Sequence, residues 1–173
     1  SEANCIALRA ARLATGKEKI IVCGYHGWHD WYLAANLKDK SNLNNHLFKD
    51  LQIEGVPKNL KDSIYSFEYN NFENLKKILD KDKNIAALIM EVKRDENPKN
   101  DFLKKIREIC NKKNVVLIFD ECTSAFRENF GGLHLKHGIA PDLAMFGKAL
   151  GNGYPITAVV GKKSIMETLT NSF

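Results

Sequence analysis

The sequence lacks long apolar runs, paired cysteines and the layout of a secretory signal. No stretch reaches the roughly 20 apolar residues that a membrane-spanning helix needs. Because the opening residues interleave polar and apolar side chains, we expect no signal peptide. None of the four cysteines forms a CxxC pair, and each lies among apolar residues, as reduced core thiols do. These absences favour a cytoplasmic protein that has no membrane partner.

A concentrated block of basic residues is also absent, although the net charge is +5. The lysines are spread along the chain and fall mostly on helix faces that we expect to be exposed. Neither a basic arm nor an aromatic RNA-binding motif accompanies them. A solvated surface explains this charge better than a nucleic-acid partner does.

The histidines do not indicate a metal centre. His26 and His29 are three residues apart, as are His134 and His137. Pairs at this spacing on a helix can chelate a metal, but a zinc site needs a third ligand. Gly27 also disfavours a regular helix at the first pair. We therefore expect no metal in this chain.

The residues that are present alternate short apolar runs with amphipathic stretches. The apolar runs predict strands at residues 19–23, 63–67, 85–90, 115–119, 143–146 and 157–160. The helical spacing of apolar residues predicts helices at residues 3–15, 71–82, 98–113 and 163–170. Residues 36–60 are polar and weakly patterned, which indicates a long excursion over the surface or over an active-site mouth. Since several strands are apolar throughout, the pattern predicts an α/β fold, with a mostly parallel sheet and helices on both faces.

Four of the predicted strands end in polar or aromatic residues. These residues are Tyr25 and His26, Glu91, Asp120 and Glu121, and Gly147 and Lys148. Chemistry gathers at the carboxyl ends of the strands in parallel sheets. We therefore expect these side chains to lie along one edge of the sheet.

Asp120 follows five apolar residues, so its carboxylate is expected to be partly buried and to need a partner. A loop-capping acid is one interpretation. Another is a Walker B acid, because the segment VVLIFDE has that pattern. The phosphate loop GxxxxGK[ST] that a nucleotide hydrolase also needs is absent. Around Lys148, for example, Ala149 follows the lysine and Asp142 stands where the first glycine would be.

Lys148 stands between a predicted strand and a glycine-rich turn, residues 147–153. A lysine in a tight apolar site loses solvation, which lowers its pKa and leaves more of the neutral amine to attack a carbonyl. The alternative is an ordinary surface lysine in a flexible turn. Lys148 taken alone does not decide between them.

Several motifs taken together resemble the class III aminotransferases, which use pyridoxal 5'-phosphate (PLP). In chain order they are SEAN at 1–4, GYHG at 24–27, DECTSAFR at 120–127, GG at 131–132, PDL at 141–143, FGKALGNGYPI at 146–156 and Gly161. The resemblance is strongest to the branch that includes glutamate-1-semialdehyde 2,1-aminomutase. It covers essentially the whole chain and is weakest at residues 36–60.

The resemblance implies roles for the residues that match the family motifs. Lys148 takes the place of the lysine that forms the internal aldimine with PLP, a Schiff base. Asp120 takes the place of the acid that pairs with the pyridine nitrogen and keeps it protonated. Once released, Lys148 could move a proton between the substrate and the cofactor. These two residues are the predicted catalytic pair.

Further residues are expected to bind the cofactor by the same resemblance. Tyr25 matches the aromatic residue that stacks on the cofactor ring. Thr123 matches a side chain near the cofactor 3-hydroxyl, and Ser1 lies at the end of the phosphate-binding turn before a helix N-terminus. His26 accompanies Tyr25 in its motif and Glu91 ends the neighbouring strand, so we include both in the cofactor site without a defined role.

The sequence also departs from the family pattern. Val92 follows Glu91 where proline is usual, and residues 93–97 (KRDEN) replace a glycine-rich stretch that lines the substrate side in relatives. Ala125 stands where glycine is common. The substrate is therefore not specified by the motifs. Family members are more than twice as long, so residues 1–173 are expected to form the central part of the PLP-binding large domain, without the N-terminal segment and the C-terminal small domain.

Two functions follow as hypotheses. The first is PLP-dependent amino-group transfer between small amino and keto substrates, by a transaminase or by the semialdehyde aminomutase, in an intact enzyme that is a homodimer. The second is a non-catalytic PLP-fold fragment that acts as a binding or assembly module. Uptake of PLP without nucleotide binding would separate the first from an ATPase.

Overall fold

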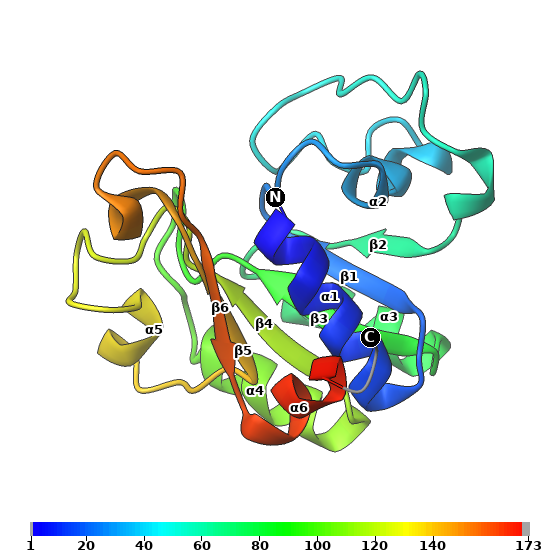
Figure 1. Cartoon of the computed structure of the whole chain (residues 1–173). Helices are drawn as coiled ribbons and strands as arrows, with labels where there is room; N and C mark the ends of the chain where they lie inside the picture. The colour runs from blue at the N-terminus through cyan, green and yellow to red at the C-terminus, as the bar shows by residue number, and fades with distance from the viewer. Residues whose placement is uncertain (1, 171–173) are drawn as a thin grey trace.

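A single sheet of six strands crosses the computed structural model, which describes residues 2–170 (Figure 1). The strands are β1 (Lys19–Cys23), β2 (Ile64–Ser66), β3 (Ile85–Met90), β4 (Val116–Asp120), β5 (Leu143–Phe146) and β6 (Ala158–Gly161). Their order across the sheet is β2-β1-β3-β4-β5-β6. The first five pair in parallel, and β6 pairs antiparallel with β5. The prediction of a mostly parallel sheet is confirmed.

The central strands are apolar because both of their faces are covered. All residues of β3 and β4 are buried, including the carboxylate-bearing Asp120 at the end of β4. Branched aliphatic side chains fit the pleated surface of a sheet and lose the most contact with water when helices cover it. This burial explains why β3 and β4 are continuous apolar runs in the sequence.

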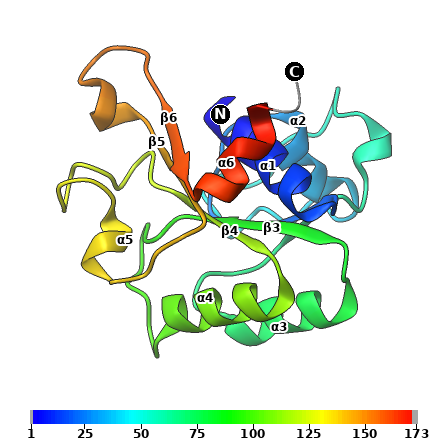
Figure 2. The ribbon, with the colours of Figure 1, turned by 60° about the horizontal axis from the view of Figure 1, so that its bottom comes forward.

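Two layers of helices cover the sheet, as predicted (Figure 2). Helices α1 (Glu2–Thr15) and α6 (Lys163–Thr170) pack on one face, in a core cluster with β1 and β3. Helices α3 (Phe72–Lys81) and α4 (Phe102–Lys113) pack on the other face. Helix α1 buries four alanines, Ala3, Ala7, Ala10 and Ala11, and these small side chains let it approach the sheet closely.

Helix α4 begins four residues later than predicted. Pro98 suits a first turn, but the helix starts at Phe102. Asn100 and Asp101 both have positive φ, at 52° and 58°. This left-handed backbone cannot continue a right-handed helix, and Asn and Asp tolerate it better than most residues do. The turn therefore delays the start of the helix.

The excursion after β1 is better anchored than its polar sequence suggested. It begins with two short elements, α2 (Asp30–Leu33) and the 3₁₀ helix η1 (Ala34–Leu37), and a second 3₁₀ helix, η2 (Lys58–Leu60), follows. Asn36 is buried, and its Oδ1 accepts a hydrogen bond from the N–H of Leu43 at 3.0 Å. Leu43 is fully buried. Local asparagine hydrogen bonds thus pin this segment against the core.

Two short elements follow β4 and β5. They are α5 (Leu133–Lys136) and the 3₁₀ helix η3 (Lys148–Gly151).

Across residues 2–170, no helix combines the length and the apolar character that crossing a membrane would require.

Candidate active site

Asp120 is the buried centre of the candidate site. It is the last residue of β4 and only 5% exposed. Its Oδ2 accepts hydrogen bonds from His26 Nδ1 at 2.9 Å and from Asn4 Nδ2 at 3.0 Å. Its Oδ1 accepts one from the backbone N–H of Cys122 at 3.1 Å. Three donors from three parts of the chain therefore meet at one carboxylate.

The orientation of the two side-chain donors follows from their acceptors. Asn4 Nδ2 also donates to the carbonyl oxygen of His26 at 3.0 Å, so both acceptors face the amide nitrogen. Since an ionised carboxylate only accepts, His26 Nδ1 carries the hydrogen in its contact with Asp120. Among residues 2–170, Asn4 Oδ1 and His26 Nε2 are buried without a hydrogen-bond partner. The site thus has two polar atoms beside Asp120 that can still form a hydrogen bond.

These donors set the charge of Asp120. Burial alone would raise the pKa of this carboxyl, because it penalises the charged form. The hydrogen bonds from His26, Asn4 and the Cys122 N–H outweigh burial, and the pKa of Asp120 lies below its ordinary value. Asp120 is therefore a buried anion at neutral pH.

Lys148 follows β5, the parallel strand that neighbours β4, so it lies at the same edge of the sheet as Asp120. It follows Phe146 and Gly147 at the end of β5, and its Nζ donates to Thr123 Oγ1 at 3.0 Å. Its backbone is left-handed, with φ 44°. The side chain is exposed, which agrees with the surface lysine of the two interpretations that the sequence left open. The glycine-rich turn packs its backbone but leaves the amine open.

Gly147 lies in close contact with the segment after Asp120. A Cβ at position 147 would lie 2.9 Å from Cys122 Sγ, closer than real side-chain carbons approach. With a larger residue at position 147, the Cys122 side chain would have to move for the turn that carries Lys148 to pack against the segment after Asp120. The close approach of the two segments allows Lys148 to reach Thr123.

Tyr25 follows β1 by two residues and is held by other rings. Its ring makes edge contacts with Tyr32, at 5.6 Å between centroids, and with Phe48, at 5.1 Å. Phe48 belongs to the long excursion, so residues 36–60 do contribute to the surroundings of a candidate site residue. The backbone N–H of Tyr25 donates to Glu91 Oε2 at 3.3 Å. These contacts fix where the ring can lie.

Glu91 contacts the Tyr25 segment and is itself held by Arg94. Its two carboxylate oxygens accept from Nε and Nη2 of Arg94, each at 2.6 Å. A Cβ at position 24 would lie 2.5 Å from Glu91 Oε2, and Gly24 has φ 111°, so this position favours glycine on both counts. The carboxylate of Glu91 thus faces Arg94 and Gly24. Its predicted contact with a cofactor stays a prediction.

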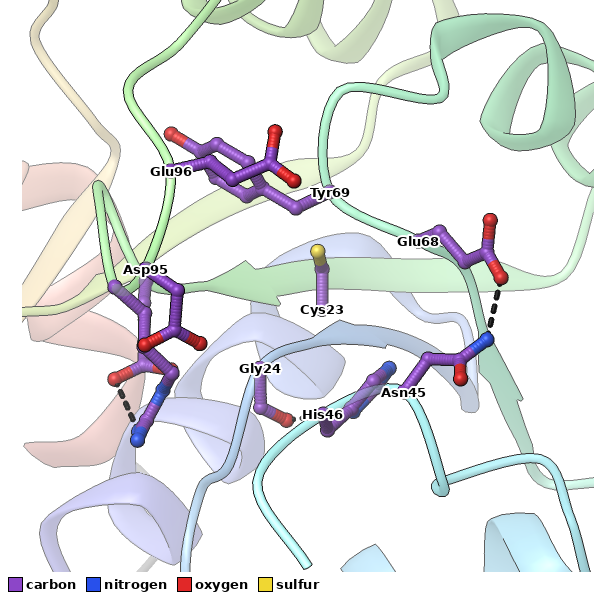
Figure 3. A pocket seen from close by; sticks show the side chains of 10 residues that line it. Cys23, Gly24, Asn45, His46, Glu68, Tyr69, Asp95 and Glu96 are labelled. Atoms are coloured by element: carbon purple, nitrogen blue, oxygen red, sulfur yellow. Dashed lines mark hydrogen bonds and ion pairs between the residues drawn. The ribbon is translucent and has the colours of Figure 1, made fainter.

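Glu91 and Arg94 also line a cavity of about 260 Å³ at the ends of β1, β2 and β3 (Figure 3). Gly24 and His46 form one wall, and Tyr69 and Glu96 form the opposite one (Figure 3). Burial, followed by the nearby His26, lowers the pKa of His46 to about 4, so the His46 ring is neutral at pH 7. Its Nδ1 donates to the carbonyl of Gly24 at 2.7 Å.

Glu121 anchors the loop that carries Thr123. It is fully buried and accepts hydrogen bonds from the N–H of Leu133 at 3.0 Å and from N and Nδ1 of His134, both at 2.8 Å. The hydroxyl of Ser124 also donates to it. Burial opposes ionisation, but these donors bring the pKa of Glu121 below its usual value. His134 is thus a partner of Glu121, and no metal-binding cluster occurs among residues 2–170.

The model of one family, the class-III aminotransferases, matches residues 1–172 of the chain. The chain belongs to this family. The resemblance drawn from the motifs is therefore confirmed.

This class-III chain is similar to curated relatives over nearly its whole length. It is 39% identical over 178 residues to the 3-aminobutyryl-CoA aminotransferase of Cloacimonas acidaminovorans, a match that covers 99% of this chain and 39% of the relative. It is 40% identical over 178 residues to the glutamate-1-semialdehyde 2,1-aminomutase of Sulfolobus acidocaldarius, covering 98% of this chain and 40% of the relative.

Solved structures of the same kind share the fold. A transaminase structure with PLP bound superposes with a TM-score of 0.81 and 26% identity, covering 95% of this chain and 39% of that one. The class-III chain therefore spans about two fifths of the length of the proteins that it matches.

The structure brings some of the predicted residues together and leaves others apart. Asp120 contacts His26, and Lys148 contacts Thr123. Tyr25 joins Glu91 through its backbone. Ser1 lies outside residues 2–170, so its predicted role at the cofactor phosphate stays a prediction.

Asn4 is a site residue that the sequence motifs did not indicate. It lies on the buried face of α1, among alanines, and the available signal was a polar side chain at an otherwise apolar helical position.

Proposed function

We propose that the protein to which this chain belongs transfers amino groups with PLP, with Lys148 holding the cofactor and Asp120 pairing with its ring nitrogen. The observation that carries this proposal is the pairing of two groups at neighbouring strand ends of a class-III chain. One is a buried, ionised Asp120, and the other is an exposed Lys148 amine resting on Thr123. Relatives named as an aminotransferase and an aminomutase, and a transaminase with PLP bound, support it.

The residues present fit this cofactor. Asp120 offers a buried negative charge to a protonated ring nitrogen, and Oδ1 has a free acceptor position because Cys122 occupies only one. The unpartnered Asn4 Oδ1 and His26 Nε2 lie on the side chains that hold Asp120. Lys148 offers a primary amine that the glycine-rich turn leaves accessible.

PLP, when bound, supplies an electron-withdrawing ring that stabilises the electron pair left when the substrate carbon loses its proton. The chain's own residues prepare this step. Asp120 favours the protonated ring by charge pairing. Lys148 is the residue that would hold the cofactor, and its free Nζ would take and return a proton at the substrate carbon. Thr123 positions Nζ, and Tyr25 offers a ring for stacking.

Transaminase and aminomutase differ in what happens after the first half reaction. A transaminase releases a keto product and accepts a second amino donor, whereas an aminomutase returns the amino group to a neighbouring carbon of the same substrate. The similarity to a glutamate-1-semialdehyde 2,1-aminomutase makes the second a specific alternative. Residues 93–97, where the family pattern is lost, are the part of this chain that we expect to influence the choice.

We further propose that the intact protein is a cytoplasmic homodimer and that this chain is the central part of its PLP-binding large domain. Exposed aromatic side chains support an interface. Phe130 is 92% exposed and Tyr154 is 81% exposed. Large exposed aromatic residues are typical of surfaces that another chain covers.

Covalent trapping tests the cofactor assignment. A lysine amine condenses with the PLP aldehyde, with loss of water, and borohydride adds hydride to the resulting C=N bond and makes the link permanent. Mass spectrometry then locates the modified peptide. We expect preferential labelling of Lys148. The Lys148→Ala variant should lose it, and Lys163→Ala, which removes an exposed lysine on α6, should keep it.

The trapping is performed on this chain and on the longest protein product that carries it. Selective Lys148 labelling in either supports the proposal. Labelling spread over surface lysines in both would overturn it. If Lys148 is labelled selectively, conversion of glutamate-1-semialdehyde without an added amino donor would favour the aminomutase over the transaminase.

A further inference from the structure

Asn4 is a buried amide in an unusual place. It is 1% exposed and lies on the face of α1 that packs against the sheet beside Ala3 and Ala7. Burying an amide costs free energy unless its hydrogen bonds are made. An apolar side chain would suit this face equally well if packing were the only requirement. The contacts of Asn4 therefore indicate what it does.

The two hydrogens of Asn4 Nδ2 join two parts of the candidate site. One goes to Asp120 Oδ2 and the other to the carbonyl oxygen of His26, both at 3.0 Å. His26 follows Tyr25 in the chain, so the same amide holds the backbone beside the aromatic ring and the carboxylate. One side chain thereby fixes the relative position of Tyr25 and Asp120.

The acceptor positions of the Asp120 carboxylate are only partly filled by the protein. A carboxylate oxygen has two lone pairs directed for hydrogen bonding. Oδ2 uses both, for Asn4 and for His26 Nδ1 at 2.9 Å. Oδ1 uses one, for the N–H of Cys122 at 3.1 Å. One acceptor position remains, and it lies on Oδ1.

We propose that Asn4 is a positioning residue for the cofactor: together with His26 it fills Oδ2 of Asp120, so that Oδ1 accepts the N–H of the PLP ring, and it ties this carboxylate to the Tyr25 segment. This inference rests on the proposed function. It assigns to Asn4 an effect on the cofactor that an ordinary buried helix anchor would not have. The experiment therefore measures cofactor binding separately from stability.

The informative variant is Asn4→Asp, which keeps the shape of the side chain but places oxygen where the amide nitrogen donates. Its matched control is Asn36→Asp. Asn36 is equally buried, at 1% exposed, and its amide donates to the carbonyl of Leu51 at 3.3 Å, within the excursion after β1. Both variants should lower the thermal unfolding temperature. Only Asn4→Asp should change the binding and the absorption of PLP.

Two cofactor readouts are measured in the longest protein product that binds PLP. The dissociation constant of PLP should rise by about 10- to 100-fold in Asn4→Asp, the range expected for one lost hydrogen bond to a charged group. The pH at which the absorption band of bound PLP changes should rise. A poorly paired ring nitrogen is protonated less and withdraws fewer electrons from the C=N bond, which becomes more basic. Asn36→Asp should leave both values unchanged.

A second pair of variants decides if Asn4→Asp does not fold. His26→Asn keeps a donor near the Nδ1 position, whereas His26→Leu removes it. The proposal expects tighter PLP binding and a smaller shift of the absorption midpoint in His26→Asn than in His26→Leu. Equal behaviour of these two would overturn it.

The outcomes separate the two proposals. Wild-type protein without selective Lys148 labelling would refute the proposed function and this inference with it. Wild-type labelling together with an unchanged PLP dissociation constant and absorption midpoint in folded Asn4→Asp would refute only the inference about Asn4.

Discussion

At the scale of single residues, one buried carboxylate lies at the end of the strands opposite the candidate site. Asp142 precedes β5 and accepts from the N–H of Leu117 at 2.8 Å. It also pairs with Arg107 Nη1 at 2.9 Å and with Lys162 Nζ at 2.6 Å. Burial works against its charge, but these partners bring the pKa of Asp142 below its usual value. The Asp142 carboxylate therefore links α4, the sheet and the start of α6 through these three partners.

We expect Asp142→Asn to lower the free energy of unfolding by about 1.5–3 kcal/mol at pH 7, the cost of losing hydrogen bonds to a charged group. Because the pKa of Asp142 is lower in the folded chain, its contribution is complete above the unfolded pKa of about 3.9 and is lost as the pH falls through the folded value. Urea denaturation of both proteins at pH 7 and near pH 3 checks this. A difference that stays constant between the two pH values would contradict it.

At the scale of secondary-structure elements, one glycine allows β6 to pair with β5. Gly161 lies opposite Leu143 in the antiparallel ladder. A Cβ there would lie 2.4 Å from the carbonyl oxygen of Asp142 and 3.0 Å from the Cα of Leu143. Both neighbours are backbone atoms and cannot rotate away.

Gly161→Ala is therefore expected to lower the free energy of unfolding by about 1–3 kcal/mol, as overpacking of a tight site does. Val160→Thr, a change of similar size on the adjacent exposed position, should stay within about 0.5 kcal/mol of wild type. Thermal unfolding of the two variants gives the comparison. Equal stability of Gly161→Ala and wild type would mean that the strand shifts to make room.

The elements that the sequence predicted well are continuous apolar runs and helices with a repeating apolar face. The predicted strand at 143–146 agrees with β5, and the predicted helix at 163–170 agrees with α6. The start of α4 was wrong because positive φ at Asn100 and Asp101 depends on the local turn, which apolar spacing does not report. The short helices at 30–37 and 133–136 contain too few residues to show a period.

The candidate site also has a part that the sequence predicted and a part that it did not. Strand ends predicted the region of Asp120 and Lys148, because parallel strands bring their carboxyl ends to one edge. The role of Asn4 could not be predicted, since its partner Asp120 is 116 residues away in the chain. Whether Lys148 is buried or exposed was left open by the sequence, because a glycine-rich turn can close on its own backbone and leave a side chain outside, as it does here.

At the scale of the whole molecule, exposed apolar side chains gather on the segments after β4 and β5. Phe130 and Leu135 belong to the first segment, and Tyr154 and Ile156 to the second. The two segments lie on the same side of the sheet (Figure 1, Figure 2). A soluble protein rarely leaves such a surface open.

We expect the chain to self-associate through this surface. Substituting serine for both Phe130 and Tyr154 should weaken association about tenfold or more, because truncating an aromatic anchor usually costs over about 1 kcal/mol. Leu47→Ser, at an exposed position of the excursion after β1, is the matched control. Sedimentation velocity over a range of concentrations measures the effect. If the double variant associates as wild type does, the surface is not the interface.

The contact between Asn4 and Asp120 also has a consequence for biosynthesis. A ribosome makes Asn4 more than a hundred residues before the carboxylate that it binds. Until β4 emerges, the Asn4 amide on the buried face of α1 can donate to the carbonyl of His26 but lacks the acceptor that Asp120 supplies. We expect the nascent chain to hold α1 loosely until Asp120 arrives. The cofactor pocket would then be complete only after β4 has joined the sheet, so uptake of PLP would report that α1 and β4 are already docked.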